Sequence, residues 1–417
     1  MTALQLLALI VVAMLLQLGA GIGWTLWRRR SGTVTVPATP PGASPERGAR
    51  TEAAWQGLRT FRVTKRENED AARSQCSFHL QPMDGGPLPA FKPGQFLTFT
   101  LDVAAASQDA ATATRAVTRC YSLSDSPDPT HFRVTIKRVP APPDHPEYPP
   151  GLASNHFHDR VQVGDVLELK APGGRFFIDP DPNASVVLIA GGIGITPMMS
   201  MLRWCAAVQP QRAVHLYYGV RHGREQAFKP QLEALAAARP AFRLNVVYSR
   251  PDPTDLVGRD FQHEGRIDVG LLQRTLPPGR HLFYVCGPPA LMQSLVPALA
   301  EWGVPVADIH FEAFGPATVR LPGALEADVA ELADVDIRFT RSGRTLAWDG
   351  QDATLLDFAE RHGIAVESGC RTGGCGSCET RLLEGSVTYA SPPDHKPAAG
   401  HCLLCVGRPA SPLVLEA

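Results

Sequence analysis

The sequence predicts a multidomain protein. One N-terminal transmembrane helix precedes an antiparallel β-barrel, a doubly wound α/β domain with a parallel sheet, and a small α+β domain. Three observations support this fold class. Residues 1–27 carry no charge, the strand pattern changes near Ser185, and five of the nine cysteines lie between positions 370 and 405. A chain of 417 residues suits two to four domains of roughly 100–200 residues each.

The composition excludes two classes of protein. The 40 Lys and Arg residues nearly balance 41 Asp and Glu residues, for a net charge of −1. The chain therefore lacks the basic footprint of a nucleic-acid-binding protein, and we expect no nucleic-acid partner. A hydrophobic fraction of 44% is enough for folded cores and excludes wholesale disorder.

Residues 1–30 predict a membrane anchor. Met1–Trp27 is mostly Leu, Ala, Val, Ile and Met, and as a helix it is about 40 Å long, against a hydrocarbon core of ~30 Å. Three arginines at positions 28–30 follow directly. Basic residues after the span predict a single-pass protein of the cytoplasmic (inner) membrane whose folded domains face the cytoplasm. The alternatives are an atypical signal peptide, whose basic residues would come first, and an apolar helix docked on a partner.

The composition of residues 31–54, which are rich in Pro and Ser, predicts a linker. Residues 55–182 are predicted to form the barrel. Short runs rich in Val, Phe and Thr show period-two character, as in RTFRVTKRE, GQFLTFTLDV and HFRVTIKRV. Turn signals such as DGGPLP separate these runs. The pattern is typical of an antiparallel barrel or sandwich.

Residues 183–316 alternate between strands and helices. The strand cores are SVVLIA, AVHLYYGV, RLNVVYS and HLFYVC, and a helical stretch follows each one. This alternation predicts a parallel, doubly wound sheet. A second linker at 317–333 leads into the small domain at 334–417. There we expect a hairpin at DIRFTRSGRTLAW, a helix at ATLLDFAERHG and a closing strand at SPLVLEA.

The most specific motif is the C-x4-C-x2-C spacing of Cys370, Cys375 and Cys378, followed by Cys402 and Cys405. This is the plant-type [2Fe–2S] spacing. The small residues between the cysteines let the backbone wrap a cluster and aim N–H groups at its sulfurs. Zinc is the alternative, since four thiolates also suit zinc, but paired C-x2-C arms do not need Cys370. From the residues alone, the fourth ligand is either Cys402 or Cys405.

This segment strongly resembles plant-type ferredoxins over about 80 residues, and the resemblance implies a β-grasp fold. The fourth cysteine of that family lies in an L-x-C-V strand, which LLCVGRP matches. The resemblance therefore implies that Cys370, Cys375, Cys378 and Cys405 bind the iron. It leaves Cys402 as a bystander.

A second motif, Arg119-Cys120-Tyr121-Ser122, lies on a predicted barrel strand. Arg can pair with a phosphate, Tyr can cover a flat ring, and Ser can hydrogen-bond a ring nitrogen. Downstream, Gly151–Ser154 is expected to open a short helix whose N-terminus faces a pyrophosphate. Without that context, the motif would read as an ordinary surface strand.

A third motif, GGIGITP, directly follows the strand SVVLIA. Its glycines permit a tight turn, and backbone N–H groups at the start of the next helix can approach a pyrophosphate. Pro stands where the third Gly of G-x-G-x-x-G would fall. The predicted dinucleotide-binding residues are Gly191, Gly192, Gly194, Thr196 and Pro197.

In this order, the two motifs resemble the ferredoxin–NADP reductase superfamily, and in particular the flavin-binding module of flavohaemoglobins. The resemblance implies that Arg119 contacts flavin phosphate, that Tyr121 packs on the isoalloxazine, and that Ser122 lies near the reactive ring nitrogen. FAD is the expected flavin, with FMN second. The set of domains resembles the phthalate dioxygenase reductase and hybrid-cluster protein reductase families.

Two later segments complete the expected site. Cys286, Gly287 and Pro288 resemble the element that brings a cysteine toward the nicotinamide, although free Cys is commonly a small buried residue. Glu312 and Phe314 lie in FEAFGP, which resembles the E-x-F-G-P segment of flavohaemoglobins, with its aromatic near the flavin face. Plain packing or surface roles are the alternative. The expected catalytic residues are Ser122, Cys286, Glu312 and Phe314.

The choice between NADH and NADPH stays open. Arg221 follows the second strand of the dinucleotide domain, and Ser249 and Arg250 follow the third. A 2′-phosphate favours a nearby Arg, but relatives that use NADH also carry Arg after the second strand. These arginines also suit a plain solvated surface.

Together the motifs predict an NAD(P)H-dependent oxidoreductase. A hydride from NAD(P)H would reach the flavin, and single electrons would pass to [2Fe–2S] and on to an unidentified protein acceptor, such as an oxygenase. One alternative is the electron-input subunit of a fixed membrane complex that reduces quinone or a cytochrome. Another is a non-enzymatic scaffold built on a decayed reductase.

Overall fold

The computed structural model describes residue 55, residues 57–104, 114–141, 149–314 and 335–389, residue 393 and residues 395–417. The expected anchor at 1–30 and the two linkers at 31–54 and 317–333 lie outside these ranges. In the part of the chain that is described, no helix is long and apolar enough to cross a bilayer. The anchor, the localisation and the domain boundaries therefore stay predictions.

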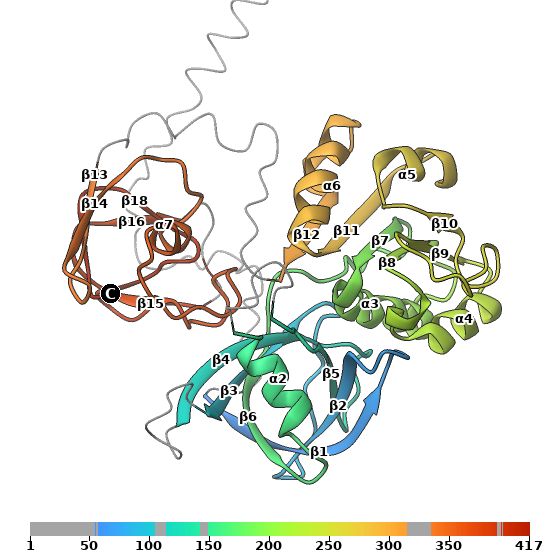
Figure 1. Cartoon of the computed structure of the whole chain (residues 1–417), viewed down its shortest axis with the longest axis horizontal. Helices are drawn as coiled ribbons and strands as arrows, with labels where there is room; N and C mark the ends of the chain where they lie inside the picture. Colours follow the sequence, from blue (N-terminus) through green and yellow to red (C-terminus); the bar gives the residue numbers. More distant parts are fainter. Residues whose placement is uncertain are drawn as a thin grey trace, which may run out of the picture. The chain divides into compact units, whose positions relative to one another are not determined.

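Six antiparallel strands form the first sheet, in the order β4-β3-β6-β1-β2-β5. They are β1 (Arg59–Asn68), β2 (Gln75–Pro82), β3 (Phe96–Ala104), β4 (Thr114–Ser122), β5 (Phe132–Lys137) and β6 (Val166–Gly173). An isolated antiparallel bridge between Leu123, the residue after β4, and Val134 of β5 links the two edges of the sheet, as the expected barrel requires. Helix α2 (Leu152–Asp159) covers the barrel (Figure 1) and buries Phe157 against Phe99.

A second six-stranded sheet is entirely parallel, in the order β10-β9-β8-β7-β11-β12. Its strands are β7 (Ser185–Gly191), β8 (Val214–Val220), β9 (Phe242–Tyr248), β10 (His263–Glu264), β11 (His281–Gly287) and β12 (Ile309–Ala313). Each expected strand core coincides with β7, β8, β9 or β11 to within one residue at its ends. The strand order reverses between β7 and β11, and ligands of open α/β sheets bind at such a switch point.

Helices cover both faces of the parallel sheet, as strand–helix alternation requires (Figure 1). Helices α3 (Ile195–Val208) and α4 (Lys229–Ala238) share one apolar core with Val186 and Leu188. Helices α5 (Val269–Thr275) and α6 (Pro289–Glu301) share the other core with Val187 and Ile189. Alternate residues of β7 therefore point into opposite cores. Three short 3-10 turns complete the domain: η1 (Gly192–Gly194), η2 (Gly223–Glu225) and η3 (Val306–Asp308).

The third unit is a mixed sheet in the order β14-β13-β19-β15-β17, with one helix. Its elements are β13 (Val335–Phe339), β14 (Arg344–Trp348), α7 (Leu355–Arg361), β15 (Glu379–Glu384), β17 (His401–Leu403) and β19 (Leu413–Leu415). A separate pair joins β16 (Val387–Tyr389) to β18 (Gly407–Pro409). The N-terminal hairpin, the helix and the closing strand lie where expected. The parallel β13–β19 pair packed against α7 is the arrangement of a β-grasp domain.

Candidate cofactor and redox site

The glycine turn after β7 lies against the end of β11. Gly192 has a φ of +52°, a backbone conformation that favours glycine. A Cβ on Gly194 would collide with the carbonyl group of Cys286, so only glycine permits this close approach. The turn leads directly into α3, where the first-turn Pro197 and Thr196 are buried. The N-terminal N–H groups of α3 thus open at the switch point, as a pyrophosphate site requires.

Cys286 and Glu312 are neighbours across the parallel strands β11 and β12. Cys286 is fully buried, and burial raises the pKa of its thiol well above the ordinary value, an effect to which Glu312 adds. Glu312 is only 6% exposed. Burial and the charge of Cys370 raise the pKa of Glu312 to about 8, while the nearby Ser122 hydroxyl lowers it. A carboxyl in this environment is mostly protonated at neutral pH.

Arg119 and the start of α2 line one small cavity of about 120 Å³. The Arg119 side chain is exposed, and its guanidinium donates to the Thr118 carbonyl at 2.8 Å. Gly151 precedes the first residue of α2, and Ser154 Oγ donates to the Gly151 carbonyl at 3.1 Å. A cationic side chain and a helix N-terminus therefore face the same space, a pairing that suits a phosphate.

Two neighbouring rings hold Tyr121 at the end of β4. Phe157 of α2 packs edge-on against Tyr121 at 5.2 Å between ring centroids, and Phe99 of β3 does so at 5.8 Å. Burial raises the pKa of Tyr121, so its phenol stays neutral. The ring is thus fixed in orientation, as a residue that packs on a flat cofactor should be.

The residues present fit a flavin. Ser122 Oγ and Glu312 Oε2 are both buried, and neither has a hydrogen-bond partner of good geometry within the described ranges. Buried polar atoms normally have such partners. The nitrogen and carbonyl groups of a flavin ring at the end of β4, beside Tyr121, would supply them.

The residues expected at the dinucleotide ribose lie together at the loops after β8 and β9. The Arg250 N–H donates to the Arg221 carbonyl at 2.8 Å, and the Ser249 N–H donates to the Val220 carbonyl at 3.0 Å. The Arg221 side chain is already paired with Glu225 at 2.5 Å. Ser249 and Arg250 are exposed, so Arg250 is the freer cation for a 2′-phosphate.

Two expected site residues lie at the rim rather than inside. Pro288 is exposed and precedes the first residue of α6, directly after Gly287 ends β11. Phe314 is 39% exposed at the end of β12. Its ring therefore contributes little to the buried part of the pocket in this structure.

The cysteine loop brings four sulfurs together. The sulfur of Cys370 lies near those of Cys375 and Cys405, and the sulfur of Cys378 lies near that of Cys405. Cys402, on β17, has no comparable side-chain contact with them, and it packs in the same apolar core as Cys378 and Cys405. The arrangement agrees with the four expected ligands, whose assignment stays a prediction.

Backbone N–H groups point at these sulfurs, as the binding site of an iron–sulfur cluster requires. Cys370 Sγ accepts from Thr372, Gly374 and Cys375 at 3.2–3.4 Å, and Cys378 Sγ accepts from the Cys405 N–H at 3.4 Å. Such bonds are a known determinant of cluster potential. Among the described residues, no group of three His, Cys, Asp or Glu side chains is arranged to hold a single metal ion.

The sequence missed one feature of the site, which is the contact between the cluster loop and the barrel. Lys170 Nζ, on β6, donates to the Cys375 carbonyl at 3.0 Å. The small cavity beside Arg119 is lined on its other side by Val366, Glu367, Ser368 and Ser377. No sequence signal identifies these contacts, because the two segments are about 200 residues apart and neither carries a motif for the other.

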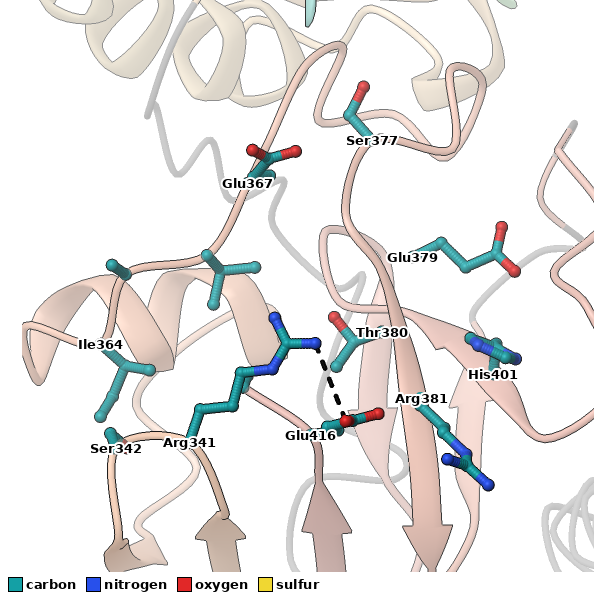
Figure 2. Close-up of a pocket in the computed structure, with 13 residues that line it drawn as sticks. Arg341, Ser342, Ile364, Glu367, Ser377, Glu379, Thr380, Arg381, His401 and Glu416 are labelled. Carbon is teal, nitrogen blue, oxygen red and sulfur yellow. Dashed lines mark ion pairs between the residues drawn. The ribbon is translucent and has the colours of Figure 1, made fainter. Parts of the chain in front are cut away.

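A larger cavity of about 500 Å³ adjoins the cluster loop. Figure 2 shows Ser377 at one end and an Arg341–Glu416 ion pair, 3.8 Å long, at the other. Three basic side chains and three carboxylates line the cavity: Arg341, Arg381, His401, Glu367, Glu379 and Glu416. The mixed charge gives it no preference for a simple anion or cation.

Comparison with known families decides the chemistry. An oxidoreductase FAD-binding domain model matches residues 73–178, and an oxidoreductase NAD-binding domain model matches residues 188–296. A 2Fe-2S iron-sulfur cluster binding domain model matches residues 337–410. The chain therefore carries an oxidoreductase FAD-binding domain, an oxidoreductase NAD-binding domain and a C-terminal [2Fe–2S] domain. The expected FAD, NAD(P)H and [2Fe–2S] cluster are thereby confirmed for this reductase.

Individual relatives resemble parts of the reductase. A flavohemoprotein from Rhodopirellula baltica is 37% identical over 280 residues, which are 66% of this chain and 65% of the relative. The reductase thus spans about 65% of the length of this curated relative. The flavohem-like FAD/NAD-binding domain of nitric oxide dioxygenase from Vibrio cholerae is 32% identical, with a TM-score of 0.53 over 62% of this chain and 99% of that one.

Two solved structures also match across the [2Fe–2S] domain. A type IV self-sufficient cytochrome P450 monooxygenase is 26% identical, with a TM-score of 0.54 over 86% of this chain and 41% of that one. Phthalate dioxygenase reductase is 27% identical, with a TM-score of 0.49 over 87% and 98% of the two chains. The family models and the flavohemoprotein relative confirm the resemblance expected from the motifs: a flavohemoprotein-like FAD/NAD module precedes a ferredoxin-type domain.

Proposed function

We propose that this reductase is anchored in the cytoplasmic membrane by residues 1–27 and passes single electrons from its [2Fe–2S] domain to an external protein acceptor of the oxygenase class. When bound, the flavin takes up two electrons as a hydride and releases them singly, which matches nicotinamide to iron–sulfur chemistry. Of the three folded parts, the [2Fe–2S] domain is then the exit for electrons.

One observation carries the proposal: the cluster loop lies against the flavin pocket. Lys170 of the barrel bonds to the Cys375 carbonyl, and the charge of Cys370 raises the pKa of Glu312. The flavin-binding domain, which would accept the hydride, and the [2Fe–2S] domain, which would carry single electrons, are therefore in contact within one chain. The match to a self-sufficient monooxygenase supports an oxygenase as the class of acceptor.

The chain's own residues have separate tasks in this scheme. Arg119 and the N-terminus of α2 hold phosphate, while Tyr121 orients the ring system. The turn at Gly191–Gly194 binds the dinucleotide at the start of α3. Glu312 holds a proton on a carboxyl that faces the pocket, where new negative charge arrives.

The test is purification of the full chain in mild detergent. We expect a coloured protein that contains flavin and iron, and that alone reduces ferricyanide and cytochrome c with NADH or NADPH. Added oxygenase components should be reduced, and a panel of them identifies the acceptor. A colourless, inactive protein contradicts the proposal. Tightly co-purifying subunits that reduce quinone would favour a fixed membrane complex instead.

A further inference from the structure

Within the Arg119–Ser122 motif, Cys120 is the one residue with no expected role in flavin binding. It lies on β4, between a residue that faces phosphate and a residue that faces the ring. Its sulfur lies close to the sulfurs of Cys370 and Cys375. Cys120, Thr98 and Lys170 are successive cross-strand neighbours, and Lys170 bonds to the cluster loop, so a side chain of the flavin domain lies beside two expected ligands of the cluster.

The contact is part of a larger junction. Lys170 Nζ donates to the Cys375 carbonyl at 3.0 Å, which brings the same loop to the neighbouring part of the barrel. Val117 and Arg119, on β4, share a cavity with Val366 and Ser377 of the [2Fe–2S] domain. These contacts place the cluster loop against β4 and β6.

The barrel also fixes the Cys120 side chain. Thr98, on β3, is the cross-strand partner of Cys120, and its Oγ1 lies 3.4 Å from Cys120 Sγ. Thr98 is only 3% exposed. A thiol is both a weak donor and a weak acceptor, so Cys120 can accept from the Thr98 hydroxyl while its own proton points to the cluster loop.

We propose that Cys120 donates an S–H···S hydrogen bond from the flavin domain to the ligand sulfurs of the [2Fe–2S] cluster, and thereby raises the cluster's reduction potential. A donor at a ligand sulfur stabilises the more negative, reduced cluster, and hydrogen bonds to sulfur are among the determinants of its potential. Cys120 is a positioning and tuning residue, because no bond to it forms or breaks. The inference rests on the proposed function only in assuming that these cysteines hold the cluster.

The test compares the full chain with three variants. Cys120→Ala removes the donor and Cys120→Ser keeps one. Cys76→Ala is the matched control, because Cys76 is a buried cysteine of the same barrel that is 1% exposed and lies on β2. In each protein, the cluster's midpoint potential is measured by a dithionite titration followed by electron paramagnetic resonance, with iron content measured in parallel. Resonance Raman spectra of the Fe–S stretching bands in H2O and D2O give a second readout.

We expect Cys120→Ala to lower the cluster's midpoint potential. The fall should correspond to a threefold to tenfold smaller equilibrium constant for reduction of the cluster. A tenfold change is about 59 mV for a one-electron couple. The D2O shift of the Fe–S bands should also shrink. Cys120→Ser should restore most of both effects, and Cys76→Ala should match the wild type.

Two results would overturn the inference. A Cys120→Ala protein with full iron and wild-type potential and Raman bands shows that the contact does not tune the cluster. Loss of iron in both Cys120 variants, with iron retained in Cys76→Ala, shows that Cys120 holds the cluster rather than donating to it. Failure of the proposed function would look different, since NAD(P)H would then leave the wild-type cluster oxidised while dithionite still reduced it.

Discussion

Glu312 should set an alkaline limit on flavin reduction in this protein. Its carboxyl is buried on β12, beside Cys286 and near Ser122. Burial raises the pKa of Glu312 to about 8, and the charge of Cys370 contributes in the same direction. Hydride transfer brings two electrons into this pocket. A neutral carboxyl tolerates that negative charge, whereas a carboxylate repels it.

The size of the effect follows from the pKa of about 8. At pH 7, about 90% of such a carboxyl is protonated, and at pH 9 only about 9% is. If the protonated form alone supports the reaction, the rate of flavin reduction should fall roughly tenfold between these two pH values. An ordinary Glu, with a pKa near ~4.3, would give no change in this range.

The assay is anaerobic stopped-flow reduction of the flavin by NADPH or NADH from pH 7 to 9. Glu312→Gln keeps the shape of the side chain without a titrating group, so its profile should be flat. Glu69→Gln is the matched control, because Glu69 is also a buried carboxyl with a raised pKa but bonds to Ser77 and Gln231 instead. A Glu312→Gln protein that still declines tenfold would refute the reasoning.

Three further outcomes are expected. Cys405→Ser should lose the cluster and the reduction of cytochrome c but keep flavin reduction by NAD(P)H; if Cys402→Ser does this instead, the ligand assignment is wrong. Arg119→Ala should weaken FAD binding by about 1.5–3 kcal/mol, roughly 13- to 160-fold, in a titration of apoprotein followed by flavin fluorescence, while the exposed Arg62→Ala binds as wild type does. Deletion of Met1–Arg30 should give a water-soluble protein with full ferricyanide reductase activity, and lost flavin chemistry in that protein would contradict a simple anchor.

Local chemistry explains why much of the fold could be predicted. The run VVLIA at 186–190 is apolar at every position because β7 is covered on both faces, by α3 on one side and α6 on the other. Barrel strands such as β1 instead alternate, because one face is solvated. The cysteine spacing is equally local: a tight loop with left-handed backbone at Arg371, Gly373 and Gly376 brings Cys370 and Cys375 together.

The parts that could not be predicted depend on long-range contacts. The sequence offers Arg221 as a phosphate ligand, but only the structure shows that Glu225, four residues later, already pairs with it at 2.5 Å. Cys120 stands at the variable position of its motif, so no pattern marks it. Its neighbour Cys370 is 250 positions away in the chain, and only the docking of the [2Fe–2S] domain on β4 brings the two sulfurs together.

Each of the three domains therefore supplies one polar group to the proposed flavin pocket. Ser122 comes from the barrel, Glu312 from the parallel sheet and Cys370 from the cluster loop. Because the charge of Cys370 already raises the pKa of Glu312, each electron that reaches the cluster should raise that pKa further. Protonation of Glu312 and reduction of the cluster then favour each other by linkage. A carboxyl that stays neutral at working pH adds no negative charge of its own to the pocket that receives the hydride.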